Sequence, residues 1–436
     1  MRRAAHIMAV ILALCSIPLG AQEGWIVLRG KVSSGRQVVP YATLQLQGTS
    51  VGTACNDAGE YELKVAVGHE ADTVLVRSLG YLPTRLTVSA LLRDGDVKLR
   101  SQAVSLREVR VSAFRSPQHL LMAAVERIDS NYHQRTSWST WFLRDWRALD
   151  GELYLFDEAV MLMMRRGYSR YADKRGYTYD PTHREMASNY KSLLRHRLMI
   201  YDREQLGRKV KDPEGVDLMM EYMDNEEFYD PVSAPQASFA LSHGTLAQHR
   251  FEPIMEYEDD GEVYYLLRAV GKGRVAKAPV SYTYTVRRSD LAIVAVTTAM
   301  TKIRMRADDE AWINVDLNWM EYVEDSSSWT YDVRDGAYTL THYYNARTVD
   351  LGNGTRWQFV PEQRWQQCVE WTMTDFSTEA VATDAEVLDV KPKTLAGAFG
   401  RSDYSSDFWG RYNSVPIDTM PLRLLEEKVS IINKQR

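Results

Sequence analysis

The residues most able to do chemistry in this sequence are a histidine and a glutamate three positions apart. His249-Arg250-Phe251-Glu252 has the H-x-x-E spacing used by zinc peptidases, and His342 is a conceivable third ligand. A zinc peptidase needs imidazoles and a carboxylate on the metal, with a further carboxylate as general base. Pro253 breaks any rigid element that would hold the pair. We therefore expect ordinary surface residues here, with no metal, cofactor or catalytic residue.

Other patterns with chemical potential give no stronger prediction. The sequence contains no Walker loop. Its acidic runs at 226–227, 258–260 and 308–310 lack the alternating ligand spacing of a calcium loop, so we interpret them as solvated turns. Cys55 and Cys368 lie too far apart in sequence to indicate a disulfide framework, and Cys55 is expected to be a buried, unreactive thiol.

Clusters of methionine and tryptophan are expected to pack in the core or stiffen the sheet, although they could also line a groove or a carbohydrate platform. Two triplets, Asp72-Thr73-Val74 and Asp418-Thr419-Met420, resemble O-glycosylation sites of envelope proteins, and the second is favoured because the first lies in an expected strand. The clustered residues are Met161, Met163, Met164, Met219, Met220, Met223, Trp312, Trp319, Trp329, Trp357, Trp365 and Trp371.

Composition limits the class of protein. The chain has 436 residues, 45% of them hydrophobic, and its 53 basic and 58 acidic residues are interspersed, so nothing indicates nucleic-acid binding. Tyrosine (25) and tryptophan (11) outnumber phenylalanine (10). Rings with a polar tip suit half-exposed β-surfaces, so the composition favours antiparallel sheet.

The N-terminus has the layout of a secretory signal peptide. Arg2 and Arg3 precede an apolar run at 7–19, and small residues follow at Gly20 and Ala21. We expect cleavage after Ala21, giving a signal peptide at 1–21. No later segment approaches the length of a membrane-spanning helix, so we expect an exported mature chain without a transmembrane helix.

From Trp25 to Val111, short apolar strands alternate with turns, which predicts a small β-sandwich. This segment resembles the carboxypeptidase-like regulatory domain, which implies a noncatalytic, transthyretin-like sandwich. The strands are expected at 26–32, 42–46, 61–65, 73–77 and 85–88. The resemblance rests on Gly30-Lys31-Val32, Val39-Pro40-Tyr41-Ala42-Thr43, Gly48-Thr49, Gly52-Thr53, Asp57-Ala58-Gly59-Glu60-Tyr61, Leu79-Gly80-Tyr81 and Leu106-Arg107-Glu108-Val109-Arg110-Val111.

Paired turn residues later in the chain predict β-hairpins. Asp-Gly or Asn-Gly dipeptides separate alternating apolar runs at 150, 260, 335 and 353, and a further hairpin crosses Ser289-Asp290. Together with a strand at 312–322 they predict a large antiparallel meander. The expected pairs are 141–149 with 153–162, 254–258 with 263–270, 282–287 with 291–300, 329–333 with 338–344, and 346–350 with 355–360.

Helices are expected in the connecting and inserted segments. Ser116 and Pro117 predict the N-cap and first residue of a helix over 117–133. Further helices are expected at 185–202, 215–223 and, more weakly, 236–248, within an insertion at about 181–250. We expect an aromatic-rich loop at 404–413 and a terminal helix at 421–432.

The expected fold is mainly β with some α: an N-terminal seven-stranded-type, transthyretin-like β-sandwich, followed by a large antiparallel meander sheet with a helical insertion. Segments after the small domain, including Trp141-Phe142-Leu143-Arg144-Asp145 and Asp407–Asn413, look like the larger Bacteroidetes-type envelope family that carries this domain. The expected domains are a sandwich at 22–112, a linker and connecting helix at 113–134, a sheet domain at 135–400, and a C-terminal loop and helix at 401–436.

The favoured function is a noncatalytic, exported envelope protein that binds or scaffolds a protein, glycan or lipid partner. It would reside in the periplasm or at the periplasmic face of the outer membrane, where peripheral association stays open. One alternative is a hydrolase acting on peptide or glycan, with a metal site near His249 and Glu252. The other is an outer-membrane β-barrel, which alternating strands also suit, although the polar C-terminus lacks a terminal aromatic strand.

Overall fold

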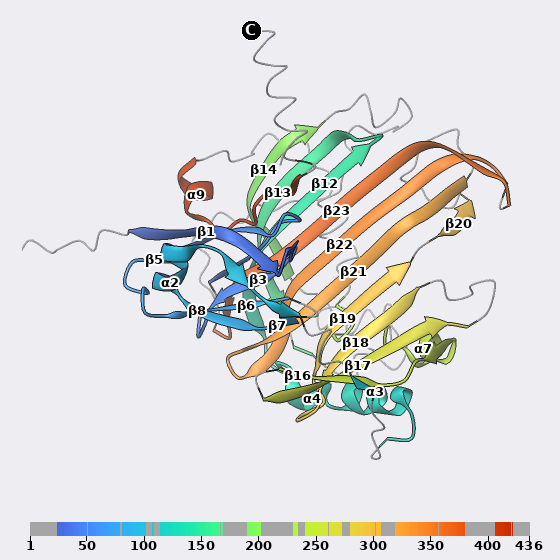
Figure 1. Ribbon diagram of the computed structural model, residues 1–436, viewed down its shortest axis with the longest axis horizontal. Coiled ribbons are helices and arrows are strands. Elements are labelled where there is room, and N and C mark those ends of the chain that lie inside the picture. The colour runs from blue at the N-terminus through green and yellow to red at the C-terminus, as the bar shows by residue number, and fades with distance from the viewer. Residues whose placement is uncertain are drawn as a thin grey trace, which may run out of the picture.

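The computed structural model places a β-sandwich against a large antiparallel sheet (Figure 1). Among the described residues, no helix is both long and apolar enough to cross a membrane. The structure describes residues 24–49, 51–78, 81–101, 107–108, 114–165, 167–168, 190–201, 230–233, 240–259, 261–272, 280–300, 302–306, 319–355, 357–379, 406–419 and 421.

The sandwich has two four-stranded sheets within the described residues, one with the order β2-β1-β5 and β9 beside β1, the other with the order β4-β3-β6-β8. Buried side chains alternate along β1, where Leu28 and Val32 join Leu44 and Leu63 in one core. The elements are β1 (Trp25–Ser34), β2 (Gln37–Val38), β3 (Thr43–Leu46), β4 (Gly52–Ala54), β5 (Glu60–Ala66), β6 (Thr73–Arg77), β7 (Tyr81–Leu82), β8 (Thr84–Thr87), α2 (Val88–Asp94), β9 (Val97–Lys98) and β10 (Arg100–Ser101).

The second sheet has 13 strands within the described residues, in the order β11-β16-β17-β18-β19-β21-β22-β23-β12-β13-β14, with β15 beside β17 and β20 beside β21. The strands are β11 (Arg107–Glu108), β12 (Ser137–Leu149), β13 (Glu152–Arg165), β14 (Tyr190–Tyr201), β15 (His249–Phe251), β16 (Met255–Asp259), β17 (Glu262–Gly271), β18 (Ser281–Arg287), β19 (Ile293–Met300), β20 (Ile303–Arg306), β21 (Trp319–Arg334), β22 (Ala337–Gly354) and β23 (Phe359–Ser377).

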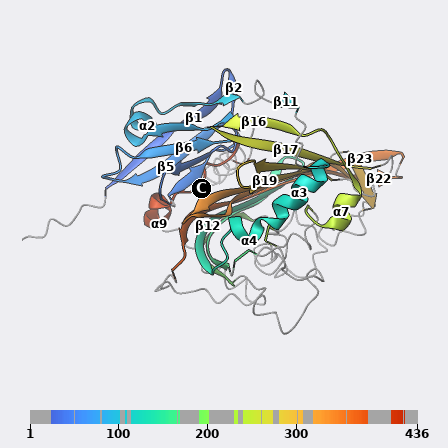
Figure 2. The same cartoon turned by 90° about the horizontal axis from the view of Figure 1, so that it is seen from below.

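The two faces of this sheet have different neighbours (Figure 2). Helices α3 (Pro117–Glu126), α4 (Ile128–Asn131) and α7 (His243–Ala247) pack on one face, where Leu143 is part of the main core. The sandwich lies over the other face, to which the next residue along β12, Arg144, contributes its side chain. Successive side chains of a β-strand point to opposite faces, so β12 contributes side chains to both interfaces.

The predicted fold class is confirmed, and so are four of the five predicted hairpins: β12 with β13, β16 with β17, β18 with β19 and β21 with β22. Positive φ angles at Asp150 (52°) and Asp335 (44°), each followed by a glycine, explain the two-residue turns. The strands are longer than predicted because β-pairing extends past the alternating apolar runs.

Two predictions within the sheet are wrong. Within the predicted helix at 185–202, the described residues 190–201 instead form strand β14, which pairs antiparallel with β13. Leucine and arginine favour a helix locally, but the edge of β13 offers unpaired backbone groups that a strand satisfies. The predicted turn at Asn353-Gly354 is also wrong, because β22 runs to Gly354 and the reversal follows at 355–358. A bulge at Leu351/Gly352 accounts for the nearby glycine: a Cβ at Gly352 would lie 2.0 Å from the Val360 carbonyl oxygen.

The helical predictions are partly correct. Ser116 caps α3, with Pro117 at its start, but the predicted helix at 117–133 breaks at Arg127 into α3 and α4. The chain then becomes extended at Tyr132, whose hydroxyl donates to the Ile293 carbonyl at 2.5 Å. In the described part of the segment predicted at 236–248, which is 240–248, residues 243–247 form a helix. The helix predicted at 215–223, and that at 421–432 beyond Pro421, lie outside the described residues.

A C-terminal segment at 406–419 joins the sandwich to the sheet. The loop predicted at 404–413 is wrong in part, because 406–411 form helix α9 (Ser406–Arg411). Its Trp409 packs with Phe142 of β12 and Ala54 of β4. Packing of aromatic side chains against both domains thus stabilises a turn of helix that the local sequence does not predict.

Polar contacts of this segment complete the edge of the sandwich. The Asn413 side chain accepts from the Lys64 backbone N–H at 2.7 Å and donates to the Lys64 carbonyl at 3.0 Å, as a neighbouring strand would. Thr419 donates from both its backbone nitrogen and its hydroxyl to Asp57 Oδ1, each at 2.7 Å. The segment therefore satisfies backbone groups at the edge of β5.

Asp418 lies in the same segment, buried between the two domains. Its carboxylate accepts from the Asp57 backbone N–H at 2.9 Å and from Trp146 Nε1 at 3.4 Å. Burial, reinforced by the negative charge of Glu370 and opposed by Arg144, raises the pKa of Asp418 from 3.8 to about 6. The folded protein therefore binds this proton more tightly than the unfolded chain does.

We predict that Asp418→Asn removes part of the pH dependence of stability. The pKa of Asp418 is higher in the folded protein than in the unfolded chain. Its protonated carboxyl therefore stabilises the fold below pH 4, and this contribution, about 3 kcal/mol at most, is lost as pH rises towards 6. Relative to the parent protein, the variant should gain stability between pH 4 and pH 7. Urea unfolding at several pH values measures the difference.

The matched control is Asp94→Asn. Asp94 is an exposed aspartate whose pKa is lowered by its hydrogen bond to Arg93, so the control should show no gain of stability as pH rises. Parallel stability curves for the parent and Asp418→Asn between pH 4 and 7 would contradict the prediction.

Candidate functional site

A cleft of about 700 Å³ lies between the sandwich and the second sheet. It is bounded on one side by β3, β6 and their loops, and on the other by β16 to β19, β21 and β22. The residues that line it are Val39, Pro40, Tyr41, Thr43, Gln45, Gln47, Gly48, Leu75, Arg77, Ser78, Tyr81, Pro83, Tyr257, Asp259, Tyr264, Thr285, Arg287, Val294, Ala295, Thr297, Ser328, Thr330, Tyr331, Asp332, Val333, Arg334, Tyr338, His342 and Tyr344.

Tyrosines give this cleft its main chemical character. Tyr257 and Tyr264, on β16 and β17, stack with ring centroids 5.2 Å apart. Tyr41 of the sandwich lies 4.2 Å from Tyr344 of β22, measured between centroids, so this pair joins the two domains. Burial raises the pKa of Tyr264 and of Tyr344. These phenols therefore stay neutral and can donate hydrogen bonds at physiological pH.

Two of the three arginines in the cleft have carboxylate partners. Arg77 of β6 forms an ion pair with Asp332 of β21, which crosses between the domains. Arg287 pairs with Asp290, and its guanidinium lies over the Tyr338 ring at 5.2 Å from the centroid. Hydrogen bonds to Asp290 raise the pKa of Arg287, so both cations are fixed in place by their neighbours.

The third arginine, Arg334, lacks a carboxylate partner among the described residues. Its Nη1 donates to the Val333 carbonyl at 3.0 Å, and its buried Nε has no hydrogen-bond partner in the described part of the chain. Burial, together with the charge of Arg77, lowers the pKa of Arg334 to about 10, so the guanidinium keeps its charge at neutral pH.

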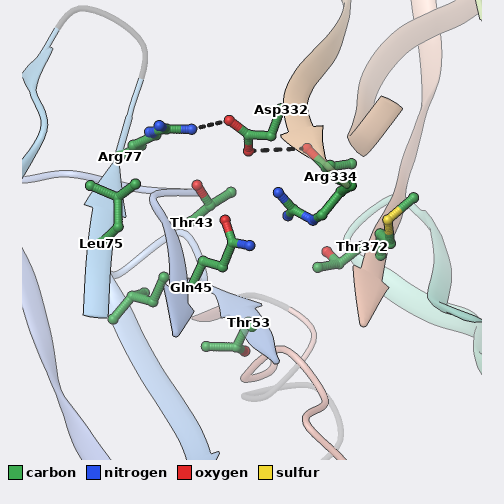
Figure 3. Close-up of a pocket in the computed structure, with 12 residues that line it drawn as sticks. Thr43, Gln45, Thr53, Leu75, Arg77, Asp332, Arg334 and Thr372 are labelled. Atoms are coloured by element: carbon green, nitrogen blue, oxygen red, sulfur yellow. Dashed lines mark hydrogen bonds and ion pairs between the residues drawn. The ribbon is translucent and has the colours of Figure 1, made fainter. Parts of the chain in front are cut away.

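A smaller pocket of about 30 Å³ adjoins the cleft (Figure 3). Arg334 extends from β21 into the space between Thr43 and Gln45 of the sandwich and Thr372 of β23. The buried Thr372 hydroxyl also has no hydrogen-bond partner among the described residues. Arg334 Nε and the Thr372 hydroxyl can both donate hydrogen bonds, and both lie at this pocket without an acceptor in the described part of the chain.

A histidine that lines the cleft forms a buried pair with a glutamate behind it. His342 Nε2 lies 3.0 Å from Glu370 Oε1, and their side chains are 6% and 5% exposed. Such a pair orients an acid–base histidine in many enzymes. Within the described residues, however, no hydroxyl or thiol forms a hydrogen bond with the His342 ring. The pair links β22 to β23.

The residues considered for a zinc site are not brought together. His249 is buried on β15, and its two ring nitrogens lie 2.7 Å from the Thr245 carbonyl and 2.8 Å from the Val280 carbonyl. Glu252 pairs instead with Arg268 at 3.4 Å, and His342 of β22 pairs with Glu370 of β23. Across the described residues, no three metal-ligating side chains gather.

Several other sequence predictions can be placed. Cys55 and Cys368 are buried free thiols, and burial raises the pKa of each, as predicted for an unreactive Cys55. Met161 and Met163 pack in the main core, as do Trp329 and Trp371, whereas Trp357 is 83% exposed. Trp319 begins β21 and Trp365 is buried; Trp312, Met219, Met220, Met223 and the acidic runs at 226–227 and 308–310 lie outside the described residues.

The glycosylation triplets fall in contrasting places. Thr73 begins strand β6, as expected, and the preceding Asp72 pairs with His69. Thr419 is exposed, but its hydroxyl donates to Asp57 Oδ1. Modification of Thr419 would therefore compete with a contact that joins the two domains.

Apart from His342, which was considered as a metal ligand, sequence reasoning did not single out the cleft residues. Tyr41 belongs to the segment that resembles the regulatory domain, but that resemblance gives it no binding role. Arg77 and Asp332 are 255 positions apart, so no local pattern relates them. The one available signal was the excess of tyrosine over phenylalanine, which gives no position.

Comparison with known proteins gives one match at the sequence level and weak matches among structures. No curated protein matches the chain. The similar structures include a DUF1329 family protein from Desulfovibrio piger (12% identity, 62% of this chain and 94% of that one, TM-score 0.23). A putative outer membrane lipoprotein-sorting protein domain from Vibrio parahaemolyticus has 9% identity, covers 62% and 96%, and also has a TM-score of 0.23. At these TM-scores, neither assigns a fold or a function to this chain.

The sequence match covers the sandwich. Residues 28–111 match the CarboxypepD_reg-like domain family. This range contains the strands of both sandwich sheets except the first residues of β1. The N-terminal part of the chain is therefore a CarboxypepD_reg-like domain, and it is followed by a second, β-rich domain.

Proposed function

We propose that this chain is a noncatalytic binding protein of the cell envelope and that it holds a glycan in the cleft between its two domains. The observation that carries the proposal is the tyrosine-lined cleft of about 700 Å³, a size typical of sites for small molecules and oligosaccharides. Both domains supply its walls, so the docked arrangement creates the site.

The side chains in the cleft favour a glycan over the other partner classes. Faces of sugar rings pack on aromatic rings, while sugar hydroxyls bond to threonine, serine and amide groups, which also line the cleft. A lipid tail would leave these polar groups without hydrogen bonds, at a cost of about 1–3 kcal/mol each. A protein partner would require a flatter and larger surface.

The polar pairs in and below the cleft support a binding role over hydrolysis. Asp332 is engaged by Arg77, and Glu370 by His342, which ties up groups that acid–base chemistry would need. A nucleophile is activated by a hydrogen-bonded base, and none is bonded to His342 within the described residues. The proposed residence in the envelope rests on the signal-peptide pattern of residues 2–21, in which two arginines precede an apolar run and two small residues.

We predict that Tyr264→Ala weakens glycan binding. Its ring stacks on Tyr257, so the variant removes half of an aromatic platform, worth about 0.5–1.5 kcal/mol. The dissociation constant for a glycan identified on an array should rise by about two- to tenfold in calorimetry. The bound oligosaccharide should be recovered uncleaved.

Trp357→Ala is the control variant, because this ring is the most exposed tryptophan among the described residues and lies at the turn between β22 and β23. Its affinity should equal that of the parent. If Trp357→Ala lost binding while Tyr264→Ala kept it, the platform would be at that turn and the cleft proposal would fail.

We also predict that the protein purified from its native host begins at Gln22 and is released from envelope membranes by carbonate. Cleavage after Ala21 follows from the small residues there, and peripheral association involves no inserted segment. N-terminal sequencing and carbonate extraction measure the two outcomes. Retention in the membrane pellet would contradict the peripheral assignment.

A further inference from the structure

The pocket beside the cleft contains two buried donor atoms for which the described part of the chain offers no acceptor. Arg334 Nε and the Thr372 hydroxyl come from β21 and β23, and neither atom has a hydrogen-bond partner among the described residues. Buried polar groups are satisfied in more than nine cases of ten. Two exceptions in one pocket indicate a place where an acceptor from outside the chain is received.

The charges around the pocket indicate which kind of acceptor it is. Arg77 is neutralised by Asp332, and Asp332 Oδ2 also accepts from Thr341 at 3.3 Å, so both of its oxygens are used. Among the described groups, the charge that acts on Arg334 is that of Arg77, which repels it. No described carboxylate thus compensates the guanidinium of Arg334, and an anion would be favoured over a neutral acceptor.

The pocket is continuous with the cleft. The two share Thr43, Gln45, Leu75, Arg77, Asp332 and Arg334 in their linings. A volume of about 30 Å³ holds a small substituent and excludes a sugar ring. A sugar ring packed against the tyrosines would therefore place a charged substituent at Arg334. The planar guanidinium group of Arg334 can bond two oxygens of a carboxylate, sulfate or phosphate.

We propose that this pocket is an anion subsite and that the ligand of the cleft is an acidic glycan whose carboxylate or ester-linked anion accepts hydrogen bonds from Arg334 and Thr372. This inference rests on the proposed glycan function. It adds the ligand's charge and the residue that recognises it.

The test compares an oligogalacturonate with its methyl ester, which has the same rings without the charge, by calorimetry on the full chain. The parent protein should bind the acid at least tenfold more tightly than the ester. Arg334→Gln should lose this preference while keeping its affinity for the ester, and Arg334→Lys should retain a part of it because it keeps the charge without the fork. The preference should also shrink as salt is raised.

Two further variants keep the test decisive. Arg268→Gln, which removes an exposed arginine paired with Glu252, should leave the preference unchanged. Thr372→Val retains the shape of its side chain and should reduce the preference several-fold, so it serves if Arg334→Gln fails to fold. Thermal midpoints of all variants establish that they are folded.

The outcomes separate this inference from the proposed function. Equal binding of acid and ester by the parent overturns the anion subsite but leaves glycan binding intact, whereas binding of neither, and of no array glycan, overturns the function. Tighter binding of a sulfated oligosaccharide, lost in Arg334→Gln, supports the subsite and identifies a sulfate ester as the anion. Equal binding of inorganic phosphate and the acidic oligosaccharide would show that the glycan contributes nothing, and would overturn the proposal.

Discussion

The arrangement of the two domains depends on the buried guanidinium of Arg144. It pairs with Glu158 of the neighbouring strand at 2.5 Å, and the remaining donors reach the carbonyls of Val415 and Pro416 in the C-terminal segment. The side chains of Arg144 and Glu158 are 3% and 0% exposed, so leaving the buried guanidinium without one of its partners would cost several kcal/mol. The sheet therefore holds the C-terminal segment at one place, and that segment satisfies the outer edge of the sandwich through Asn413.

This docking determines the geometry of the cleft. Once the sandwich is held on the face of β12 and β13, β3 and β6 lie opposite β21 to β23, and contacts such as Tyr41 with Tyr344 and Arg77 with Asp332 form across the gap. Neither domain contains the site by itself. A change at the C-terminal segment would therefore alter the cleft, although none of its residues lines it.

The contrast between what the sequence predicts and what it misses has a physical basis. Hairpins at Asp150-Gly151 and Asp335-Gly336 are predictable because a two-residue turn with positive φ is a local requirement. Strand β14 is missed because pairing with β13 outweighs a local helical preference. The cleft is missed for a stronger reason: its walls meet through domain docking, and Arg77 and Asp332 are 255 positions apart.

Arg334 Nε and the Thr372 hydroxyl, which have no hydrogen-bond partner among the described residues, also bear on why the cleft is polar. If the pocket only joined the two domains, leucine or valine at these positions would pack there without leaving donors unpaired, which costs about 1–3 kcal/mol for each buried group. The chain instead places a charged fork beside Arg77, where repulsion adds to the cost. An interface that served only stability would gain nothing from Arg334 and Thr372 at these positions. An anion-binding site would gain from them, because both side chains then donate hydrogen bonds to the anion.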